Sequence, residues 1–362
     1  MIVEVGDNYR RARELVLQFG WNTTCFQIVN PGIEYWFGQD GESVVGFVTS
    51  GRSRVVVGAP VCREGNLSAI VDAFETDAKK NELGVCYFGA EARLEAVLRD
   101  SKAHSHVLLG AQPVWQPSNW PRIMQGRASL RAQFNRARNK SVTVTEWSVE
   151  EATNDTRLQN CLEAWFTLKG LPPLHFVIEP ETLGRLENRR IFVAEHDSNV
   201  VAFLVLSPIP TRSGWLTEQF PHHPDAPNGT VELMMDFAVR RLCDENFEYL
   251  TLGLSPLSKR ARIERFDNPF WLRALLAWMR KHGQRFYNFD GLDRFKAKMT
   301  PEYWEPVFAI SNEREFSAGT MWSIALAFTQ NKPFSVVGKG LAKAAAAEID
   351  NFLRWIDSGR TK

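Results

Sequence analysis

Two carboxylates near the start of a predicted helix are the first candidates for chemistry in this sequence. Glu232 and Asp236 follow a proline-rich loop at 221–230 and open an apolar-periodic segment that predicts a helix from residue 231. Because residues four apart share one face of a helix, both carboxylates should point the same way, beside a strand predicted at 249–254. Such a pair is suited to accepting a proton or binding a cation. The alternative is that the two acids only complement the helix dipole.

A second stretch combines positive charge with helical spacing. Between residues 121 and 140 there are six basic residues and no acidic one. Leu130 and Phe134 supply a narrow apolar stripe, which predicts a helix whose outer face is basic. The basic residues are Arg122, Arg127, Arg131, Arg136, Arg138 and Lys140. In a chain of net charge +1 such a helix indicates contact with phosphates, and the alternative is a solvated helix edge.

The composition of the whole chain is typical of a globular protein. Hydrophobic residues make up 44% and charged residues 23% of 362 residues, a length that favours two domains over one core. The five cysteines form no metal-binding pattern, which indicates free thiols in a reducing compartment. The N-terminus has no signal-peptide pattern, and the apolar runs are too short to span a membrane. A cytoplasmic protein without a metal site is therefore predicted.

Both halves of the chain show a similar order of predicted elements. The first half predicts helix 8–19, strands 26–29, 34–37, 44–49 and 54–57, helix 67–81, strand 85–88, helix 91–99 and strand 107–109. The second half predicts helix 150–168, strands 190–195, 200–207 and 215–220, a helix and strand within 231–252, helix 269–282, and strands 286–289 and 305–310. Two successive units of this kind predict an α/β (α+β) fold built by duplication.

The boundaries between these units follow from local composition. Residues 112–119 are rich in proline and tryptophan, which predicts an ordered crossing between the two units. We therefore predict an N-terminal domain at 1–118, a basic helix and linker at 119–148, a C-terminal domain at 149–315 and a helical tail at 316–362. The tail holds two amphipathic segments, predicted as helices at 320–329 and 337–356, that we expect to cover the body of the protein. The alternative is that they rest on a membrane surface.

Several of these segments carry a family resemblance. The segment APNGTVELMMDFAV at 226–239 is followed by LTLGLSPLS at 250–258 and by FYNFDGLDRFKAKMTPEYWEP at 286–306. Further matching segments are LRAQFNRARNK at 130–140, TLKGLPPLHF at 167–176, LGRLENRRIFVAE at 183–195 and FLVLSPIP at 203–210. Together they resemble the cytosolic C-terminal domain of the MprF proteins, the aminoacyl-phosphatidylglycerol synthases also described as phosphatidylglycerol lysyltransferases. The resemblance runs from about residue 35 to residue 311 and is strongest from residue 130.

This resemblance implies a fold and an activity. The fold would be two tandem GNAT-type acyltransferase units, as in the Fem transferases of peptidoglycan bridges, followed by C-terminal helices. The activity would be transfer of an amino acid from an aminoacyl-tRNA to a hydroxyl group of phosphatidylglycerol or a similar membrane lipid, without CoA or another cofactor. The sequence shows no transmembrane flippase half of the MprF type, so we expect a standalone domain. Its expected position is cytoplasmic, with peripheral contact on the inner face of the membrane.

The family motifs also select the residues expected to act. Glu232 matches the acidic position of the family segment and, with Asp236, is expected to accept a proton or to bind the ammonium group of the amino acid. The residues expected to bind substrate, including its phosphates, are Lys169, Arg189, Ser255, Lys296 and Lys298. The residues expected to bind tRNA are Arg127, Arg131, Arg136, Arg138 and Lys140.

Two other functions stay open at this level. An acyl-CoA-dependent N-acyltransferase needs backbone N–H groups at the helix start to hold a pyrophosphate. The loop at 221–230 has one glycine and three prolines, which lack N–H donors, and this argues against CoA. A non-enzymatic peripheral module would bind tRNA or anionic lipid through the basic helix and the tail. The sequence predicts no oligomeric state.

Overall fold

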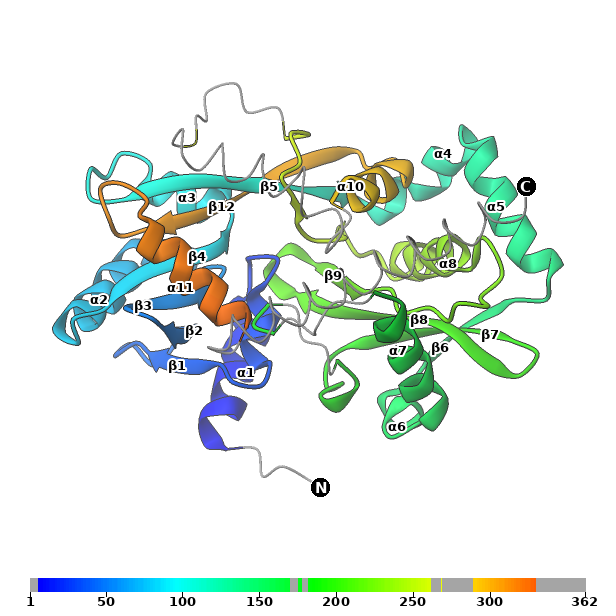
Figure 1. The fold of residues 1–362 in the computed structure, drawn as a ribbon, viewed down its shortest axis with the longest axis horizontal. Helices are drawn as coiled ribbons and strands as arrows, with labels where there is room; N and C mark the ends of the chain where they lie inside the picture. The colour runs from blue at the N-terminus through cyan, green and yellow to red at the C-terminus, as the bar shows by residue number, and fades with distance from the viewer. Residues whose placement is uncertain (1–5, 170–174, 178–181, 262–267, 269–288, 330–362) are drawn as a thin grey trace, which may run out of the picture.

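The computed structural model describes residues 6–169, 175–177, 182–261, 268 and 289–329, and within them it contains one continuous mixed sheet (Figure 1). The sheet has twelve strands in the order β1-β2-β3-β4-β12-β5-β10-β9-β8-β7-β6, and β11 pairs with β5 beside this path. Helices pack on both faces of the sheet. The mixed α/β class predicted from the sequence is confirmed.

The two halves of the chain supply the two ends of this sheet. The first half forms α1 (Asp7–Phe19), β1 (Glu34–Phe37), β2 (Val44–Ser50), β3 (Ser53–Val57), α2 (Leu67–Lys80), β4 (Gly84–Ala90), α3 (Ala92–Leu98) and β5 (Ser105–Trp115). The second half forms α4 (Trp120–Gln125), α5 (Ala128–Asn139), β6 (Thr143–Trp147), α6 (Val149–Ala152), α7 (Thr156–Lys169), β7 (Arg190–His196), β8 (Asn199–Ile209) and β9 (Gly214–Gln219). It continues with α8 (Thr230–Asp244), β10 (Tyr249–Thr251), β11 (Ser255–Pro256), α10 (Phe289–Lys298), β12 (Tyr303–Ser311) and α11 (Ala318–Phe328).

The same supersecondary unit occurs once in each half. In the first half β3 and β4 are parallel and joined through α2, and in the second half β9 and β10 are parallel and joined through α8. Each parallel pair follows antiparallel strands, β1 to β3 in the first unit and β6 to β9 in the second. A helix is the usual crossover between parallel neighbours in a sheet. The predicted pair of tandem acyltransferase-like units is confirmed in this topology.

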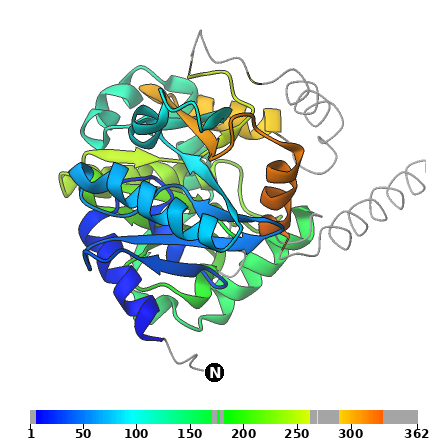
Figure 2. The ribbon, with the colours of Figure 1, turned by 90° about the vertical axis from the view of Figure 1, so that its left-hand side faces the viewer.

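Burial on both faces explains the long apolar runs of the central strands. In β8, Leu204 and Leu206 pack in the cluster that contains α8, whereas Phe203 and Val205 pack in the cluster that contains α7. A strand covered on both faces needs apolar residues at consecutive positions, not at alternate ones. In the first unit, α2 covers the face that is turned to the viewer in Figure 2, and α11 packs against β2, β3 and β4.

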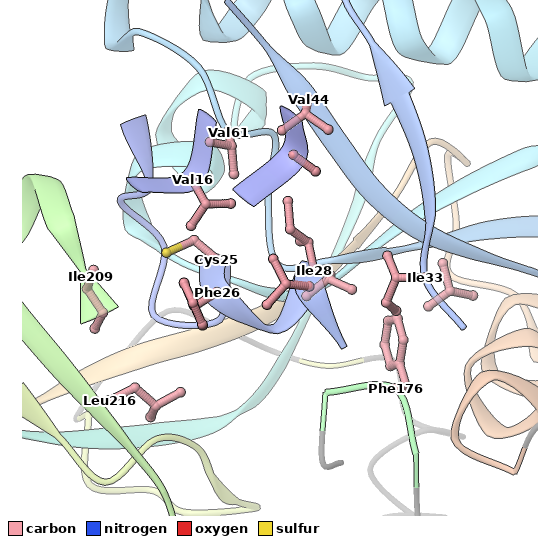
Figure 3. Packing of buried hydrophobic residues seen from close by; sticks show 14 of the residues in the cluster. Val16, Cys25, Phe26, Ile28, Ile33, Val44, Val61, Phe176, Ile209 and Leu216 are labelled. Carbon is pink, nitrogen blue, oxygen red and sulfur yellow. The ribbon is translucent and has the colours of Figure 1, made fainter. Parts of the chain in front are cut away.

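A shared apolar core joins the two units. Residues of the 3-10 helix η1 (Cys25–Val29), among them Cys25 and Phe26, pack in one cluster with Ile209 and Leu216 of the second unit (Figure 3). The same cluster includes Ile324 of α11, so this tail helix covers the body as predicted. β12, from the second half, lies between β4 and β5 of the first. Because the sheet runs through both halves, the domain boundary at residue 118 stays a prediction.

Some predicted elements differ in the structure. Residues 26–29 form part of η1 and no strand, because the N–H groups of Cys25, Gln27 and Asn30 donate to carbonyls three residues earlier, at 2.9–3.0 Å. The predicted strand 107–109 extends to Trp115 as β5, so it includes part of the expected crossing. The strand predicted at 249–254 stops at Thr251.

Two predicted helices are each divided in two. The basic segment 121–140 forms α4 and α5, which are separated at Gly126, a poor helix former. The segment 150–168 forms α6 and α7, because Asn154 adopts φ 62° and the Asp155 side chain accepts the N–H groups that open α7. The predicted helices 269–282 and 337–356 lie outside the described residues, as does most of the predicted strand 286–289.

Each described helix is either too short or too polar for a membrane span. Within the described ranges, none is both long and apolar enough to cross a bilayer.

Candidate active site

The two strands of the second βαβ unit separate before β9 ends. β9 and β10 pair up to Leu216 and Thr251, after which β9 continues alongside β8 to Gln219 while the chain of β10 turns away. Gly253, at φ 66°, makes this turn possible, and we call the point of separation the β9/β10 splay. Ligands of open α/β sheets bind outside the carboxyl ends of the strands, so the splay is the first place to seek a site.

The corresponding strands of the first unit stay joined. The N–H of Gly58, just after β3, donates to the carbonyl of Phe88 in β4 at 2.7 Å. The side-chain amide of Asn22 donates to the next carbonyl, that of Gly89, at 3.2 Å. A Cβ at Gly58 would collide with side-chain oxygens of Asn22 and Thr24, so the end of this strand pair is filled by the chain itself. The two units are therefore unequal, and the second has the open strand ends.

Helix α10 lies across the splay and places a lysine in it. Lys296 is buried, with 4% of its surface exposed, and its Nζ donates to the carbonyls of Gly253 at 2.9 Å and Leu254 at 2.7 Å. These carbonyls follow Thr251, the last residue of β10 that pairs with β9. They therefore accept hydrogen bonds from the Lys296 side chain in place of the backbone of a neighbouring strand. On the β9 side, Phe295 makes an edge contact with Phe220 at 5.7 Å between ring centroids. Burial lowers the pKa of Lys296 to about 7, against an opposing effect of Asp293.

A second set of contacts ties α10 to the chain after the splay. Asp293 accepts from the hydroxyl of Ser255 at 3.2 Å and from Nε of Arg260 at 2.8 Å. Burial on its own would raise the pKa of Asp293, but hydrogen bonds from Ser258, Arg260 and Ser255 outweigh it and hold this pKa below the usual range. Asp293 and Arg260 were not among the predicted site residues. The signal for Asp293 was its place in the segment GLDRFKAKM, three residues before Lys296, so both lie on one face of α10.

Glu232 lies at the rim of the same region. It stands in the first turn of α8 and forms an ion pair with Lys298 of α10, with 2.8 Å between Oε1 and Nζ. The Glu232 side chain is 13% exposed and that of Lys298 40%, so the pair borders solvent whereas Lys296 does not. The two lysines, two residues apart in α10, therefore lie in different surroundings. Figure 1 shows α10 beside α8, the helix that this ion pair joins to it.

Asp236 has different surroundings from Glu232 although it lies one turn later. It is 1% exposed and accepts from Nε1 of Trp120 at 2.9 Å and from Nε of Arg240 at 3.0 Å, with Nη2 of Arg138 at 3.5 Å. It therefore holds α4, α5 and α8 together and does not form a pair with Glu232 around one substrate. Its catalytic role stays a prediction that these contacts do not favour.

The other predicted substrate-binding residues lie away from α10. Arg189 is buried, and its guanidinium donates to Glu218 at 2.6 Å, to the carbonyl of Arg185 at 2.6 Å and to Asn30 at 3.1 Å. Because all three guanidinium nitrogens of Arg189 donate hydrogen bonds within the protein, a structural role is favoured. Its role in substrate binding stays a prediction. Lys169 is the last residue of α7, and its side chain lies outside the described residues.

The predicted tRNA-binding residues lie on the surface of the second unit. Leu130, Phe134 and Ala137 face the core from α5. The basic residues on and beside the opposite face are exposed, namely Arg127, Arg131, Arg136, Arg138 and Lys140. The prediction of a helix with a basic outer face is confirmed for α5, and its ligand is untested.

One partly buried polar network was not found from the sequence. Arg212 contacts Glu91 at 2.9 Å and Glu305 at 2.5 Å, and its guanidinium lies 3.7 Å from the ring centroid of Tyr249. Gln112 and Tyr249 both donate to Glu305, at 2.9 and 2.8 Å. Burial raises the pKa of Glu91, with Arg212 opposing and Glu305 adding to the effect. These side chains come from positions 91 to 305, so no local spacing indicates them. The network joins the two units.

Comparison with known proteins agrees with this architecture. The family model described as phosphatidylglycerol lysyltransferase, C-terminal, matches residues 13–311. The chain belongs to this family. Both segments that meet at the splay lie inside the matched region.

A curated relative is longer than this chain, and two solved structures share its fold. The phosphatidylglycerol lysyltransferase of Staphylococcus aureus is 21% identical over 317 residues, which cover 85% of this chain and 36% of that protein. The chain thus spans about a third of its curated relative. The structure of L-PGS from Bacillus licheniformis has a TM-score of 0.74 at 20% identity, covering 90% of this chain and 97% of that one. A C-terminal domain assigned to lysylphosphatidylglycerol synthetase in Agrobacterium fabrum has a TM-score of 0.76 at 19% identity, covering 90% and 98%.

Proposed function

We propose that this chain transfers an aminoacyl group from a charged tRNA to a hydroxyl group of phosphatidylglycerol or a similar membrane lipid. One observation carries the proposal. Two of the segments that carry the family resemblance, 250–258 and the described part of 286–306, meet at the β9/β10 splay through Lys296 and Asp293. Family membership supports the reaction class, since the curated relative is named phosphatidylglycerol lysyltransferase.

The reaction exchanges one ester for another. The oxygen of the lipid hydroxyl attacks the carbonyl carbon of the aminoacyl ester, and its proton passes to a base. The tetrahedral intermediate then collapses, the bond to the ribose oxygen of the tRNA breaks, and that oxygen takes the proton back. The donor ester is already activated, so the site must supply a base, a cation-binding carboxylate and donors for the oxyanion.

Lys296 is suited to be the base. Its pKa of about 7 leaves much of the amine unprotonated at neutral pH, which is the range where a general base works best. A neutral amine can donate its two N–H groups to the carbonyls of Gly253 and Leu254 and keep its lone pair for the substrate proton. These carbonyls then fix the direction of the lone pair. This role differs from the phosphate contact predicted from the sequence.

Glu232 and Lys298 are suited to binding the charged parts of the substrates. Only Oε1 of Glu232 is bound to Lys298, and within the described residues no donor contacts Oε2. That oxygen is available to the ammonium group of the transferred amino acid. The exposed ammonium of Lys298 is available to the phosphate of the lipid or of the tRNA end.

The start of α8 argues against an acyl-CoA donor. The N–H and the hydroxyl of Thr230 both donate to the carbonyl of Pro227, at 3.1 and 2.6 Å, so neither is free for a pyrophosphate. Gly229 lies so close to α5 that a Cβ would collide with the carbonyl oxygen of Gln133. Neither the polar groups of Thr230 nor the α5 side of Gly229 can therefore hold a pyrophosphate.

A transfer assay tests the proposal. Purified protein is incubated with vesicles that contain phosphatidylglycerol and with total tRNA charged with one radiolabelled amino acid at a time. We expect alkali-labile label in the extracted lipid with at least one amino acid. Lys296→Met should lower the rate about 100-fold or more, the usual contribution of a positioned general base. Glu232→Gln should lower it about 10-fold or more, because the ammonium group of the amino acid loses its carboxylate partner. Lys102→Gln, an exposed lysine of the first unit, is the matched control and should match the wild type.

Three outcomes would contradict the proposal. If no amino acid enters any lipid, even from a total lipid extract, the wild-type protein is no such transferase. Tight CoA binding in calorimetry would then favour the N-acyltransferase. Binding of tRNA or vesicles that Glu232→Gln leaves unchanged, without any turnover in the wild type, would favour the non-enzymatic module.

A further inference from the structure

A small cavity lies on the surface of the second unit where α4, α5 and α8 meet. Its volume is about 400 Å³, and it is lined by Pro121, Met124, Gln125, Arg131 and Arg240. The three helices contact one another around it, at the side of the molecule where Figure 1 shows α4 and α5 beside α8. Two guanidinium groups thus meet in one concave place, although they are more than 100 residues apart in the chain.

Both arginines are held in place from behind. Arg131 donates through Nη1 to the carbonyls of Met124 and Gln125 at the end of α4. Arg240 donates through Nε to both carboxylate oxygens of Asp236, at 3.0 and 3.1 Å. Asp236 is 1% exposed and is itself held by a hydrogen bond from Trp120, so it fixes the position of the Arg240 side chain. These hydrogen bonds orient each guanidinium group. They leave Nε and Nη2 of Arg131, and Nη1 and Nη2 of Arg240, to donate to a ligand.

The charge around the cavity favours an anion. Arg138 also approaches Asp236, at 3.5 Å, so two guanidinium groups share this one carboxylate, and Arg131 adds a third positive charge at the cavity. Among the described residues, no other acid pairs with Arg131, Arg138 or Arg240. A planar guanidinium matches a phosphate group in geometry and charge.

The surroundings favour an anion with repeated charges. Further basic side chains occur on and beside α4 and α5, and there is no acid between residues 121 and 140. These exposed residues are Arg122, Arg127, Arg136 and Lys140. A single phosphate would need only the cavity, whereas a phosphodiester backbone would use the whole row.

The same surface is poorly suited to a lipid bilayer. A helix that lies in a membrane interface inserts large apolar side chains among the lipids. The exposed large apolar residues of the described chain are Val97, Tyr303 and Trp322, and none of them is on α4, α5 or α8. A soluble polyanion therefore fits this face better than a membrane does.

We propose that this cavity binds a backbone phosphate of an RNA, with Arg131 and Arg240 as its ligands and Asp236 as the residue that positions Arg240. The inference rests on the proposed function in taking that RNA to be the donor tRNA. It assigns Asp236 to donor binding, at a distance from the reacting groups on α10.

Binding of deacylated tRNA tests the inference without any transfer. Affinity is measured by fluorescence anisotropy between 50 and 300 mM NaCl for the wild type, Arg240→Gln and Arg131→Gln. Each variant should bind several-fold more weakly, and the slope of log affinity against log salt should fall by about 1, as for one lost phosphate contact. Lys102→Gln removes one positive charge elsewhere and should leave the slope unchanged.

Asp236→Asn separates positioning from net charge. The loss of one negative charge beside the site should tighten RNA binding if charge alone decides. If Asp236 positions Arg240, binding should weaken instead. Because Asp236 is buried and this variant can fail to fold, Arg240→Lys is the second test. It keeps the charge, loses the planar fork, and should also weaken binding.

The outcomes distinguish this inference from the proposed function. If the wild type binds tRNA and transfers the amino acid, and Arg240→Gln does both equally well, the cavity is not a phosphate site. If the wild type does not bind tRNA at all, the proposed donor is wrong as well. If the variants lose binding to phosphatidylglycerol vesicles and keep tRNA affinity, this face binds membrane and the inference is overturned.

Discussion

Replacing Lys296 by methionine should change how the stability of the protein depends on pH. The pKa of Lys296 is lowered from 10.5 to about 7 by burial. Between these values the unfolded chain binds a proton at this lysine that the folded chain does not, so the free energy of unfolding of the wild type rises with pH. Between pH 7 and pH 9 this single group adds about 2 kcal/mol to that free energy. Lys296→Met lacks the contribution.

Urea unfolding followed by tryptophan fluorescence gives the required free energies at the two pH values. Methionine removes the hydrogen bonds to Gly253 and Leu254 at both pH values, so their loss cancels in the comparison. The free energy of unfolding of the wild type, minus that of Lys296→Met, should be about 2 kcal/mol larger at pH 9 than at pH 7. An equal difference at both pH values would refute the reasoning, because Lys296 would then titrate alike in the folded and unfolded chains. Lys298→Met, a loss from the exposed side of α10, is the matched control. If it changed the pH dependence in the same way, the effect would not report burial.

Three further substitutions test other parts of the fold. Gly229→Ala should destabilise the protein by about 2–4 kcal/mol, because Gly229 has φ 95° and a Cβ would clash with α5. A free energy of unfolding in urea equal to that of the wild type would contradict the close contact between α5 and the start of α8. Arg212→Met should cost about 3–5 kcal/mol in urea unfolding, since the buried Glu91 and the partly buried Glu305 would lose their cation, and a loss below about 1 kcal/mol would mean that the network does not join the units. Asn22→Ala should lower the free energy of unfolding by about 1–3 kcal/mol and leave the transfer rate per folded molecule unchanged, whereas a large loss of rate would place chemistry in the first unit.

The ends of the parallel strands differ between the two βαβ units, and this difference is the main structural basis for these predictions. In the first unit the strand ends are closed by Gly58 and by the side chain of Asn22. In the second unit the corresponding strand pair separates, and a lysine from α10 takes over the carbonyls that lost their partners. Two units of one topology thus provide one closed pair of strands and one open pair.

The amino-acid sequence alone predicted most of the local structure. β1 has the bounds that were predicted, 34–37, and α2 and α8 lie where apolar residues recur with helical period. It also determined the charge of the outer face of α5, since Leu130 and Phe134 leave only one side for the core. Local spacing decides these features, because periods of two and of 3.6 residues assign side chains to faces.

The surroundings of each functional side chain, by contrast, depend on contacts that form when the chain folds. Glu232 and Asp236 share a helix face, yet one borders solvent beside Lys298 and the other is buried under Arg240. Lys296 is two residues from Lys298, but it is buried at the splay and its pKa is lowered. Burial and partners arise from segments far apart in the chain, which spacing within one segment does not report. For the same reason the place of β12 between β4 and β5 emerged only from the folded sheet.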